Sequence, residues 1–447
     1  MSEDRAAKMS TNIADESPES RTSRRRLRAC QHCDWVSALP ALRPGQAAIC
    51  PCCQHTLVRR HFRPIQRSLA LASSALLALA LAVYFPFVGF SALGLGQQIE
   101  LLQTISRLFL SGQPVIAVVV ALTIVILPCL YLLSVIWLQY SLLRQIQSTA
   151  SRHIARALKH LHPWMMADVF IIGALVSLFK IAGMADITLG TGFWAFCSFT
   201  ILLLLTMRSI DDDWMWFAIA GEPQAPIGSE TGQTAAEQNL TGCPTCGLLQ
   251  TLPDAGKAHC ARCGELLHRR RPQSLQRTWA LLLTSALLYI PANVYPIMYS
   301  TRIGITQPKT ILGGVMDLIT AGSWPIAMVI FIASVIVPIG KMFAIGWLCL
   351  RVGQQNVADR ATRARLYRIT ELIGRWSMVD VFVVAILVTL IDAGQLLSIN
   401  PGPGALAFAM VVILSMLAAN SFDPRLIWDT QQPRTRSAIR SGESLND

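Results

Sequence analysis

Long apolar stretches separated by short polar segments set the pattern of this chain. About 20 consecutive apolar residues suffice for a helix to cross the hydrocarbon core of a bilayer. Eight stretches reach or approach that length, at residues 68–90, 115–139, 167–187, 192–210, 274–298, 324–350, 379–397 and 405–420. The pattern predicts a mainly α-helical, multi-pass membrane protein with two sets of four spans.

Basic residues gather on one side of these predicted spans. They precede the first and fifth spans, and they separate the second from the third and the sixth from the seventh. The opposite connections are poor in charge, since residues 93–114 hold only Glu100 and Arg107 and residues 401–404 hold none. Because basic loops stay in the cytoplasm, we expect both chain ends and both segments ahead of the four-span sets to be cytoplasmic.

The composition agrees with a membrane protein. Hydrophobic residues make up 53% of the chain and charged residues 14%, with a mean hydropathy of +0.46, whereas a soluble domain carries about 25% charged residues. The net charge of +12 would by itself suggest a nucleic-acid partner. Since the basic residues lie at the ends of spans, we interpret the excess as a topology signal and expect no nucleic-acid binding.

The two halves of the chain repeat one another. "WMMADVFIIGALVSLFKIAG" begins at Trp164 and "WSMVDVFVVAILVTLIDAG" at Trp376. Three further pairs match, namely "ILPCLYLLSVIWL" with "IVPIGKMFAIGWL", "SIDDDWMW" with "SFDPRLIW", and "YFP" at Tyr84 with "YIP" at Tyr289. An even number of spans returns the chain to the same side. The repeats should therefore be parallel and related by a pseudo-two-fold axis along the membrane normal.

A pair of Cys-x2-Cys doublets precedes each set of spans. The first set comprises Cys30, Cys33, Cys50 and Cys53, and the second comprises Cys243, Cys246, Cys260 and Cys263. We call these the first and second cages. Two such turns aim four sulfurs at one ion, the arrangement of zinc ribbons, and a cytoplasmic position disfavours disulfides. Cys52 is a rival ligand in "CPCC", although the register favours its two neighbours.

The four cysteine ligands determine the identity of the metal only in part. Four thiolates predict one zinc ion per cage and two per chain, whereas a rubredoxin-like iron site has the same ligands and stays open as an alternative. A site with four protein ligands is structural rather than hydrolytic. Segments of this size are too short to hold a core without a metal.

These signals divide the chain into seven parts. In order, they are a disordered tail at 1–27, a zinc-ribbon-like domain at 28–62, a transmembrane bundle of four helices at 63–217, a linker at 218–238, a second zinc-ribbon-like domain at 239–270, a second four-helix transmembrane bundle at 271–428, and a disordered tail at 429–447. The N-terminal tail lacks the apolar core of a signal peptide, so the first span has to act as its own insertion signal.

Ionisable residues within the spans are candidates for a transport pathway, because charge at membrane depth is costly. Lys180 and Asp392 occupy equivalent repeat positions, and with Asp186 they form the predicted polar cluster in the outer half of the membrane; snorkelling of Lys180 and Asp392 is the alternative. The secondary candidates are Asp168, Asp380 and Lys341. The two aspartates start spans three and seven, where the helix dipole alone would favour them.

No motif in the sequence indicates catalysis. The chain lacks a Walker loop, a Gly-x-Gly-x-x-Gly turn before a strand, a His-Glu-x-x-His motif and a nucleophile elbow. We therefore expect neither an enzyme nor ATP-driven transport by this chain alone.

The cages, the spans and their duplication together resemble the paraquat-inducible protein A family, including its lipophilic envelope-spanning tunnel A branch. The most specific pieces are "WSMVDVFVV" from Trp376 and "SFDPRLIWD" from Ser421, and the first half keeps the scheme more loosely as "WMMADVF" and "SIDDDWMW". The resemblance covers roughly residues 30–428.

This resemblance implies a function. Members are inner-membrane proteins of double-membraned bacteria that work with periplasmic tunnels built from mammalian-cell-entry (MCE) domains, and the pair moves phospholipid between membranes and maintains the envelope. The resemblance would place the lipid path between the two bundles and the docking site of the tunnel at residues 93–114 and 299–323. Two other functions stay open, a redox or stress-response protein with iron in the cages and a non-transporting scaffold.

Overall fold

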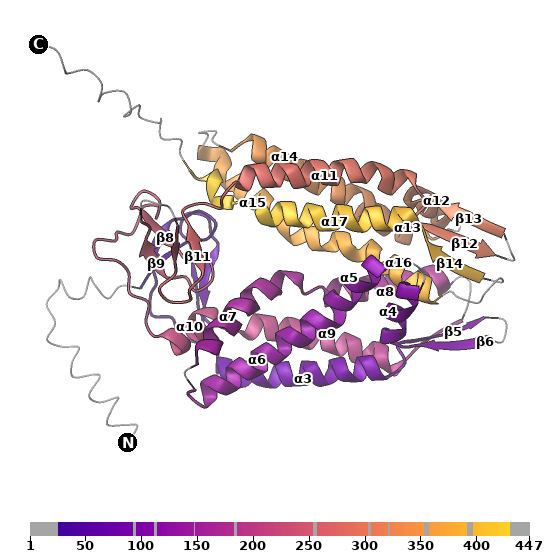
Figure 1. The fold of residues 1–447 in the computed structure, drawn as a ribbon, viewed down its shortest axis with the longest axis horizontal. Coiled ribbons are helices and arrows are strands. Elements are labelled where there is room, and N and C mark those ends of the chain that lie inside the picture. Colours follow the sequence, from indigo (N-terminus) through magenta and orange to yellow (C-terminus); the bar gives the residue numbers. More distant parts are fainter. Residues whose placement is uncertain are drawn as a thin grey trace, which may run out of the picture.

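The computed structural model describes residues 26–429 except 93–94, 111–113, 147, 183–185, 254–256, 303–304, 321, 353–356 and 391–396. Figure 1 shows three layers along the long axis, with small β domains at one end, helices in the middle and two β-sheets at the other end. We call these ends the cage end and the sheet end. The first half of the chain forms the lower helical bundle in this view and the second half forms the upper one.

The first half runs through helices and strands in a fixed order. Its elements are α3 (Pro64–Tyr84), β5 (Val88–Ala92), β6 (Leu95–Ile99), α4 (Leu101–Leu110), α5 (Pro114–Ala121), the π-helix η1 (Leu122–Ile126), α6 (Leu127–Leu143), α7 (Thr149–Leu161), the 3-10 helix η2 (His162–Trp164), α8 (Ala167–Ala182), β7 (Asp186–Leu189), α9 (Thr191–Ser209) and α10 (Asp212–Ala220).

The second half repeats this order, except that a 3-10 helix stands where the first half has α10. Its elements are α11 (Ser274–Val294), β12 (Met298–Arg302), β13 (Ile305–Lys309), α12 (Ile311–Thr320), α13 (Trp324–Phe331), the π-helix η3 (Ile332–Ile336), α14 (Val337–Leu350), α15 (Val357–Gly374), the 3-10 helix η4 (Arg375–Met378), α16 (Val379–Leu390), β14 (Leu397–Pro401), α17 (Pro403–Ser421) and the 3-10 helix η5 (Pro424–Ile427). The predicted duplication is therefore present in the fold.

Within the described residues, six helices are long and apolar enough to cross a membrane. They are Pro64–Tyr84, Pro114–Leu143, Thr149–Phe179, Thr191–Ser209, Ala327–Leu350 and Pro403–Ser421. The prediction of eight spans exceeds this number by two. The stretch 274–298 corresponds to α11, which has 21 residues but includes Gln276 and Arg277. The stretch 379–397 corresponds to α16, which has 12 residues.

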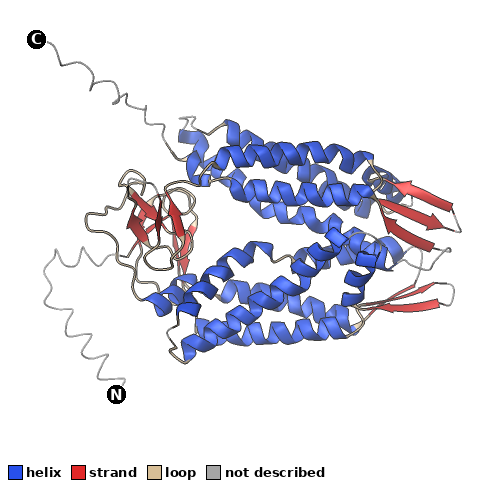
Figure 2. Cartoon of the chain, in the orientation of Figure 1, coloured by secondary structure: helices blue, strands red, loops and turns tan. Residues whose placement is uncertain are grey.

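The predicted ends of three spans were wrong at the sheet end. Helix α3 ends at Tyr84, α8 at Ala182 and α11 at Val294. The apolar residues that follow form strands, which a hydropathy count cannot separate from the end of a helix. β5 pairs with β6 and β7, and β12 pairs with β13 and β14, all antiparallel. Figure 2 shows both sheets at the same end of the molecule.

The structure also corrects one match between the repeats. Pro86 and Pro296 each follow a 21-residue helix by two residues, so they are the equivalent prolines, and the match of Tyr84 with Tyr289 was wrong. Their carbonyls accept the N–H groups of Gly192 (2.9 Å) and Gly404 (3.1 Å). A Cβ on either glycine would lie within 3 Å of a backbone oxygen, so this corner requires glycine in both halves.

Helices α8 and α16 join the two halves. The rings of Phe170 and Phe382, which are equivalent in the repeat, meet edge to face at 5.5 Å. A Cβ added at Gly173 would lie 3.0 Å from the Cβ of Phe382, and Ser177 Oγ donates to the Val383 carbonyl at 3.3 Å. Equivalent residues facing one another are the arrangement that a pseudo-two-fold axis predicts, and the contact is closely packed.

Small residues line the helix pairs inside each bundle. Ala72, Ala75 and Ala82 of α3 are fully buried, and α3 packs along α9 as α11 packs along α17. Ser285 of α11 donates to the Val411 carbonyl of α17 at 3.1 Å. Small side chains allow two helix backbones to approach closely, which is how helices associate in a membrane.

Candidate metal centres

Each cage is built from two turns between short strands. In the first cage, Cys30 and Cys33 lie between β1 (Leu27–Ala29) and β2 (Val36–Ala38), and Cys50 and Cys53 lie between β3 (Ala47–Ile49) and β4 (Thr56–Arg59). The Sγ atoms of Cys30 and Cys53 are 3.5 Å apart, as are those of Cys33 and Cys50. Tetrahedral zinc with bonds of about 2.3 Å holds its sulfurs about 3.8 Å apart, so the cluster fits such an ion.

The second cage has the same construction. Cys243 and Cys246 lie between β8 (Leu240–Gly242) and β9 (Leu249–Thr251), and Cys260 and Cys263 lie between β10 (Lys257–His259) and β11 (Leu266–His268). Its sulfurs also pair at 3.5 Å, Cys243 with Cys263 and Cys246 with Cys260. All eight cysteines are buried, and within each cluster the ligand atoms lie within 4.8 Å of one another. Both clusters could hold a metal ion.

A left-handed residue completes each of the four turns. Asp34, Gln54, Gly247 and Gly264 follow the second cysteine of their doublets with φ of 64°, 59°, 72° and 73°. The N–H of each donates to the carbonyl of the first cysteine at 2.8–3.0 Å. This local turn directs both sulfurs of a doublet to the same point. The sequence hints at it only in the second cage, where both residues are glycine.

Cys52 lies outside both clusters. It is half-buried and is no member of the four-sulfur group that Cys50 and Cys53 complete.

Hydrogen bonding among the thiols of each cage, together with burial, raises the pKa of Cys33 and of Cys246. Four thiolates so close together need a cation to stabilise them, and metal binding releases their protons.

Replacing Gly247 with alanine is expected to destabilise the second cage more than replacing Gly264 does. Either alanine has to adopt the left-handed conformation, at a cost of roughly 1–2 kcal/mol. At Gly247 the new Cβ would also lie 2.6 Å from Cζ of Arg28, whereas at Gly264 the nearest atom is Arg156 Nη2 at 3.4 Å. The rate of metal loss to a chelator would measure the difference, and equal rates would contradict this account.

The two cage domains pack side by side. A Cβ added at Gly242 would lie 2.9 Å from the Cβ of Ala29, and Gln31 Nε2 donates to the Pro244 carbonyl at 2.7 Å. The segment predicted as a linker docks on the first domain, where Val36 N–H donates to the Gln233 carbonyl at 2.9 Å. The two cage domains therefore form one block at the cage end.

Each cage also contacts the bundle that it does not precede. Trp428, which follows the last helix of the second half, packs on the first cage. Arg270 bridges Asp34 of the first cage at 2.9 Å and Asp429 at 2.5 Å. In the second cage, Arg262 donates to the Gly221 carbonyl of the first half at 2.6 Å. These crossed contacts tie both halves together at the cage end.

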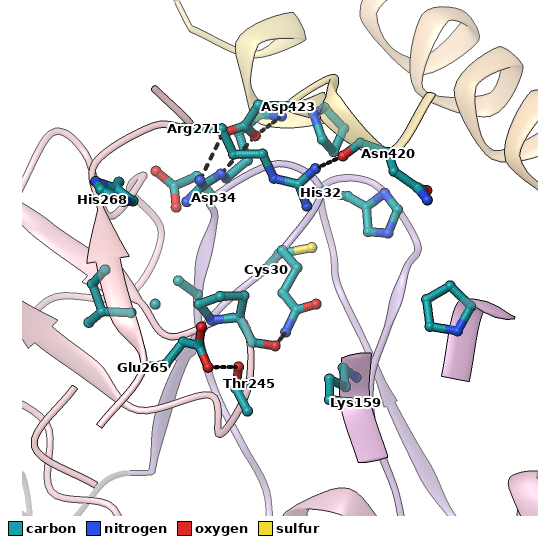
Figure 3. Close-up of a pocket in the computed structure, with 18 of the residues that line it drawn as sticks. Cys30, His32, Asp34, Lys159, Thr245, Glu265, His268, Arg271, Asn420 and Asp423 are labelled. Atoms are coloured by element: carbon teal, nitrogen blue, oxygen red, sulfur yellow. Dashed lines mark hydrogen bonds and ion pairs between the residues drawn. The ribbon is translucent and has the colours of Figure 1, made fainter. Parts of the chain in front are cut away.

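A cavity of about 640 Å³ lies between the cages and the helix ends. Figure 3 labels Cys30, His32 and Asp34 from the first domain, Thr245, Glu265 and His268 from the second, Lys159 from α7, and Arg271, Asn420 and Asp423 from the second half. Several of these charges have partners, since His160 Nε2 lies 3.5 Å from Glu265 and Arg271 N–H donates to Asp423 at 3.1 Å. We interpret this cavity as part of the junction between the halves.

The structure describes two of the three residues of the predicted polar cluster. Lys180 lies in the last turn of α8. Asp186 is the first residue of β7, paired with Ser91 of β5, so placing it inside a span was wrong. Asp392 lies outside the described residues. Whether the three side chains meet stays a prediction.

The secondary candidates occupy two settings. Asp168 lies in the first turn of α8 and Asp380 is the second residue of α16, where the helix dipole favours a negative charge. Lys341 is different, because it lies within α14 and only 5% of it is exposed.

The π-helices η1 and η3 were not predicted from the sequence. η1 ends two residues before Pro128, and η3 ends two residues before Pro338. A proline inside a helix leaves a carbonyl without its donor, and π-turns are frequent at functional sites. The proline in the middle of an apolar stretch was the available signal.

The model of the family "Paraquat-inducible protein A" matches residues 65–220 and 275–432, one match for each helical half. The chain belongs to the paraquat-inducible protein A family. Both the resemblance and the duplication are thereby confirmed, and the protein is a multi-pass membrane protein.

Similar proteins of this family are named as transport proteins. The chain is 40% identical to "Intermembrane transport protein PqiA" of Escherichia coli (strain K12) over 90% of this chain and 95% of that protein. It is 30% identical to "Lipophilic envelope-spanning tunnel protein A" of the same strain over 90% and 91%. A "Probable intermembrane transport protein" of Haemophilus influenzae is 27% identical over 89% and 95%. No solved structure matches the chain.

Proposed function

We propose that this chain is the inner-membrane component of a system that moves phospholipid between membranes and maintains the bacterial envelope, without enzymatic activity. The observation that carries the proposal is 40% identity to an intermembrane transport protein over nearly the full length of both chains. The embedded helical halves and the paired β-sheets at one end support it, since such a chain can meet lipid within the membrane and a partner outside it.

The orientation follows from the distribution of charge. Arg60, Arg156, Arg270 and Arg351 are examples of the basic residues that lie at the cage end. Since basic segments stay in the cytoplasm, the proposal places the cages and both chain ends there and the sheet end in the periplasm. The two three-stranded sheets, with edge strands β6 and β13, are then the docking surface for a tunnel of MCE domains.

Each cage binds one zinc ion in this proposal, which gives two per chain. The buried four-thiolate clusters suit zinc, and the function of the ions is structural, because each cage connects strands of only three or four residues. Iron in the same ligands would support the redox alternative. Metal analysis of the purified protein and its visible absorption distinguish the two metals.

The transport pathway is proposed to use Lys180, Asp186 and Asp392 near the sheet end. The triple variant Lys180→Met, Asp186→Asn and Asp392→Asn is expected to abolish transfer of phospholipid from proteoliposomes to the tunnel partner. Lys257→Met removes an exposed charge at the cage end and serves as the control. Wild-type transfer in the triple variant would remove this cluster from the mechanism, and no transfer by the wild-type pair would overturn the proposed function.

A further inference from the structure

A second, smaller cavity at the cage end lies beside the one in Figure 3. Its volume is about 330 Å³, and it is walled by the first cage domain, η2, α14, α15 and α17. His32 and His55 close it from the cage side, and Met416, Ala419 and Asn420 line it from the last turns of α17. It therefore lies where the helices leave the apolar layer, close to the level of lipid headgroups.

Lys341 of α14 reaches this cavity as a buried cation. Only 5% of the residue is exposed, and its Nζ has no hydrogen-bond partner among the residues that the structure describes. An ammonium group buried without a partner is strongly destabilising, so such a residue calls for a ligand.

Gly374 of α15 makes room for this side chain. A Cβ at that position would lie 2.9 Å from Lys341 Nζ and 3.0 Å from its Cε. The lysine thus crosses directly over the backbone of α15. The equivalent position in the first half is Tyr131, so the amine is a property of the second half alone.

The remaining wall suits an anion with an apolar attachment. Arg368 of α15 is half-buried in it, and the described residues offer this guanidinium no ion pair. Leu372 and Met416 are apolar. Glu371 adds one carboxylate to the lining, which would repel an anion. Its side chain, however, is exposed and takes part in another interaction. Two cations and apolar side chains in one lining match a phosphate group that carries a chain.

We propose that this cavity binds a phosphate group, with Lys341 donating to a phosphate oxygen and Arg368 providing the second positive charge. The shared chemistry is an anionic phosphate, supplied by a phospholipid headgroup or by free phosphate. The inference goes beyond the proposed function, because the site lies at the end opposite the transport cluster. Its measurement needs no tunnel partner.

The test uses the full chain in neutral detergent. One arm titrates dioleoylphosphatidylglycerol and counts bound lipid by native mass spectrometry, and the other titrates inorganic phosphate by calorimetry. Lys341→Met is expected to weaken binding about ten-fold, the effect of losing one hydrogen bond to a charged group, and Arg368→Gln to weaken it several-fold. Arg365→Gln changes an exposed arginine of the same helix outside the cavity and should leave binding unchanged.

The outcomes separate the possible sources. A Lys341-dependent effect in the lipid arm identifies a headgroup site, and the same effect only in the phosphate arm identifies free phosphate. Thermal unfolding of Lys341→Met should be unchanged or at higher temperature, since an unpartnered buried charge is removed. Binding that is equal in wild type, Lys341→Met and Arg368→Gln in both arms overturns the site, even if lipid transfer to the tunnel is intact.

Discussion

Replacing Cys50 with serine should reduce bound metal from two ions per chain to one and unfold the first cage. The four sulfurs of this cage are buried together, and the strands that they connect have only three or four residues each. Metal binding contributes about 10–16 kcal/mol in small zinc domains, more than any other interaction available to this segment. The number of metal ions per chain, measured by mass spectrometry of the purified protein, checks the result.

Cys52→Ser is the matched control for this change. Cys52 is a cysteine of the same turn, but it lies outside the cluster. Two ions per chain should remain in the Cys52 variant. If Cys52→Ser loses the ion and Cys50→Ser keeps it, the ligand register is wrong.

Asp423→Asn is expected to destabilise the second half by roughly 3 kcal/mol, the cost of removing one partner from a buried charge pair. Asp423 is 1% exposed. It accepts hydrogen bonds from Arg425 Nη2 at 2.8 Å, from Arg425 Nε at 2.9 Å and from the N–H of Arg271 at 3.1 Å. Asparagine would leave the guanidinium with a weaker acceptor. The midpoint of thermal unfolding in detergent should fall by several degrees.

Asp211→Asn, at the equivalent position of the first half, should have little effect. Asp211 caps α10 by accepting from Trp214 N–H at 2.9 Å, and its nearest cation is Arg60 at 3.7 Å. Burial raises the pKa of Asp211. Burial is also the largest single influence on Asp423, but the hydrogen bonds and charge of Arg425 and the N–H of Arg271 together outweigh it and lower the pKa of Asp423. Asparagine keeps the cap and removes a charge that burial disfavours. Equal losses in the two variants would contradict this difference between the halves.

The same contrast fixes the pH dependence. Because the folded pKa of Asp423 is lowered, its contribution is fully present above the unfolded value near 3.8 and is lost as pH falls through the folded pKa. The raised pKa of Asp211 acts oppositely, since folding is favoured by its neutral form and this advantage disappears as pH rises through the folded pKa. The Asp423→Asn deficit should therefore shrink in acid.

Local signals made the cages and the spans predictable. The doublet Cys243-x2-Cys246 encodes its own turn within five residues, which the left-handed Gly247 completes. Helices such as α9 and α17 need about 20 apolar residues whatever their neighbours are. These features depend on residues close together in the chain, and the structure contains them where the sequence indicates.

Signals that depend on distant partners were misinterpreted. The strand that begins at Val88 is apolar and was read as the end of a span, because only its pairing with β6 and β7 reveals a sheet. The same error placed Asp186 in the membrane. The match of Tyr84 with Tyr289 followed a similarity of letters, whereas the contacts of Pro86 and Pro296 with Gly192 and Gly404 set the true register.

The sequence by itself determined a duplicated membrane protein with a four-cysteine cluster ahead of each half, since hydropathy and cysteine spacing act over short distances. The tertiary structure alone decided how the halves meet at Phe170 and Phe382 and how each cage contacts the opposite bundle. It also decided that Lys341 lies buried over Gly374. The physical reason is that packing between segments hundreds of residues apart selects the partners of a side chain, and no local pattern records that choice.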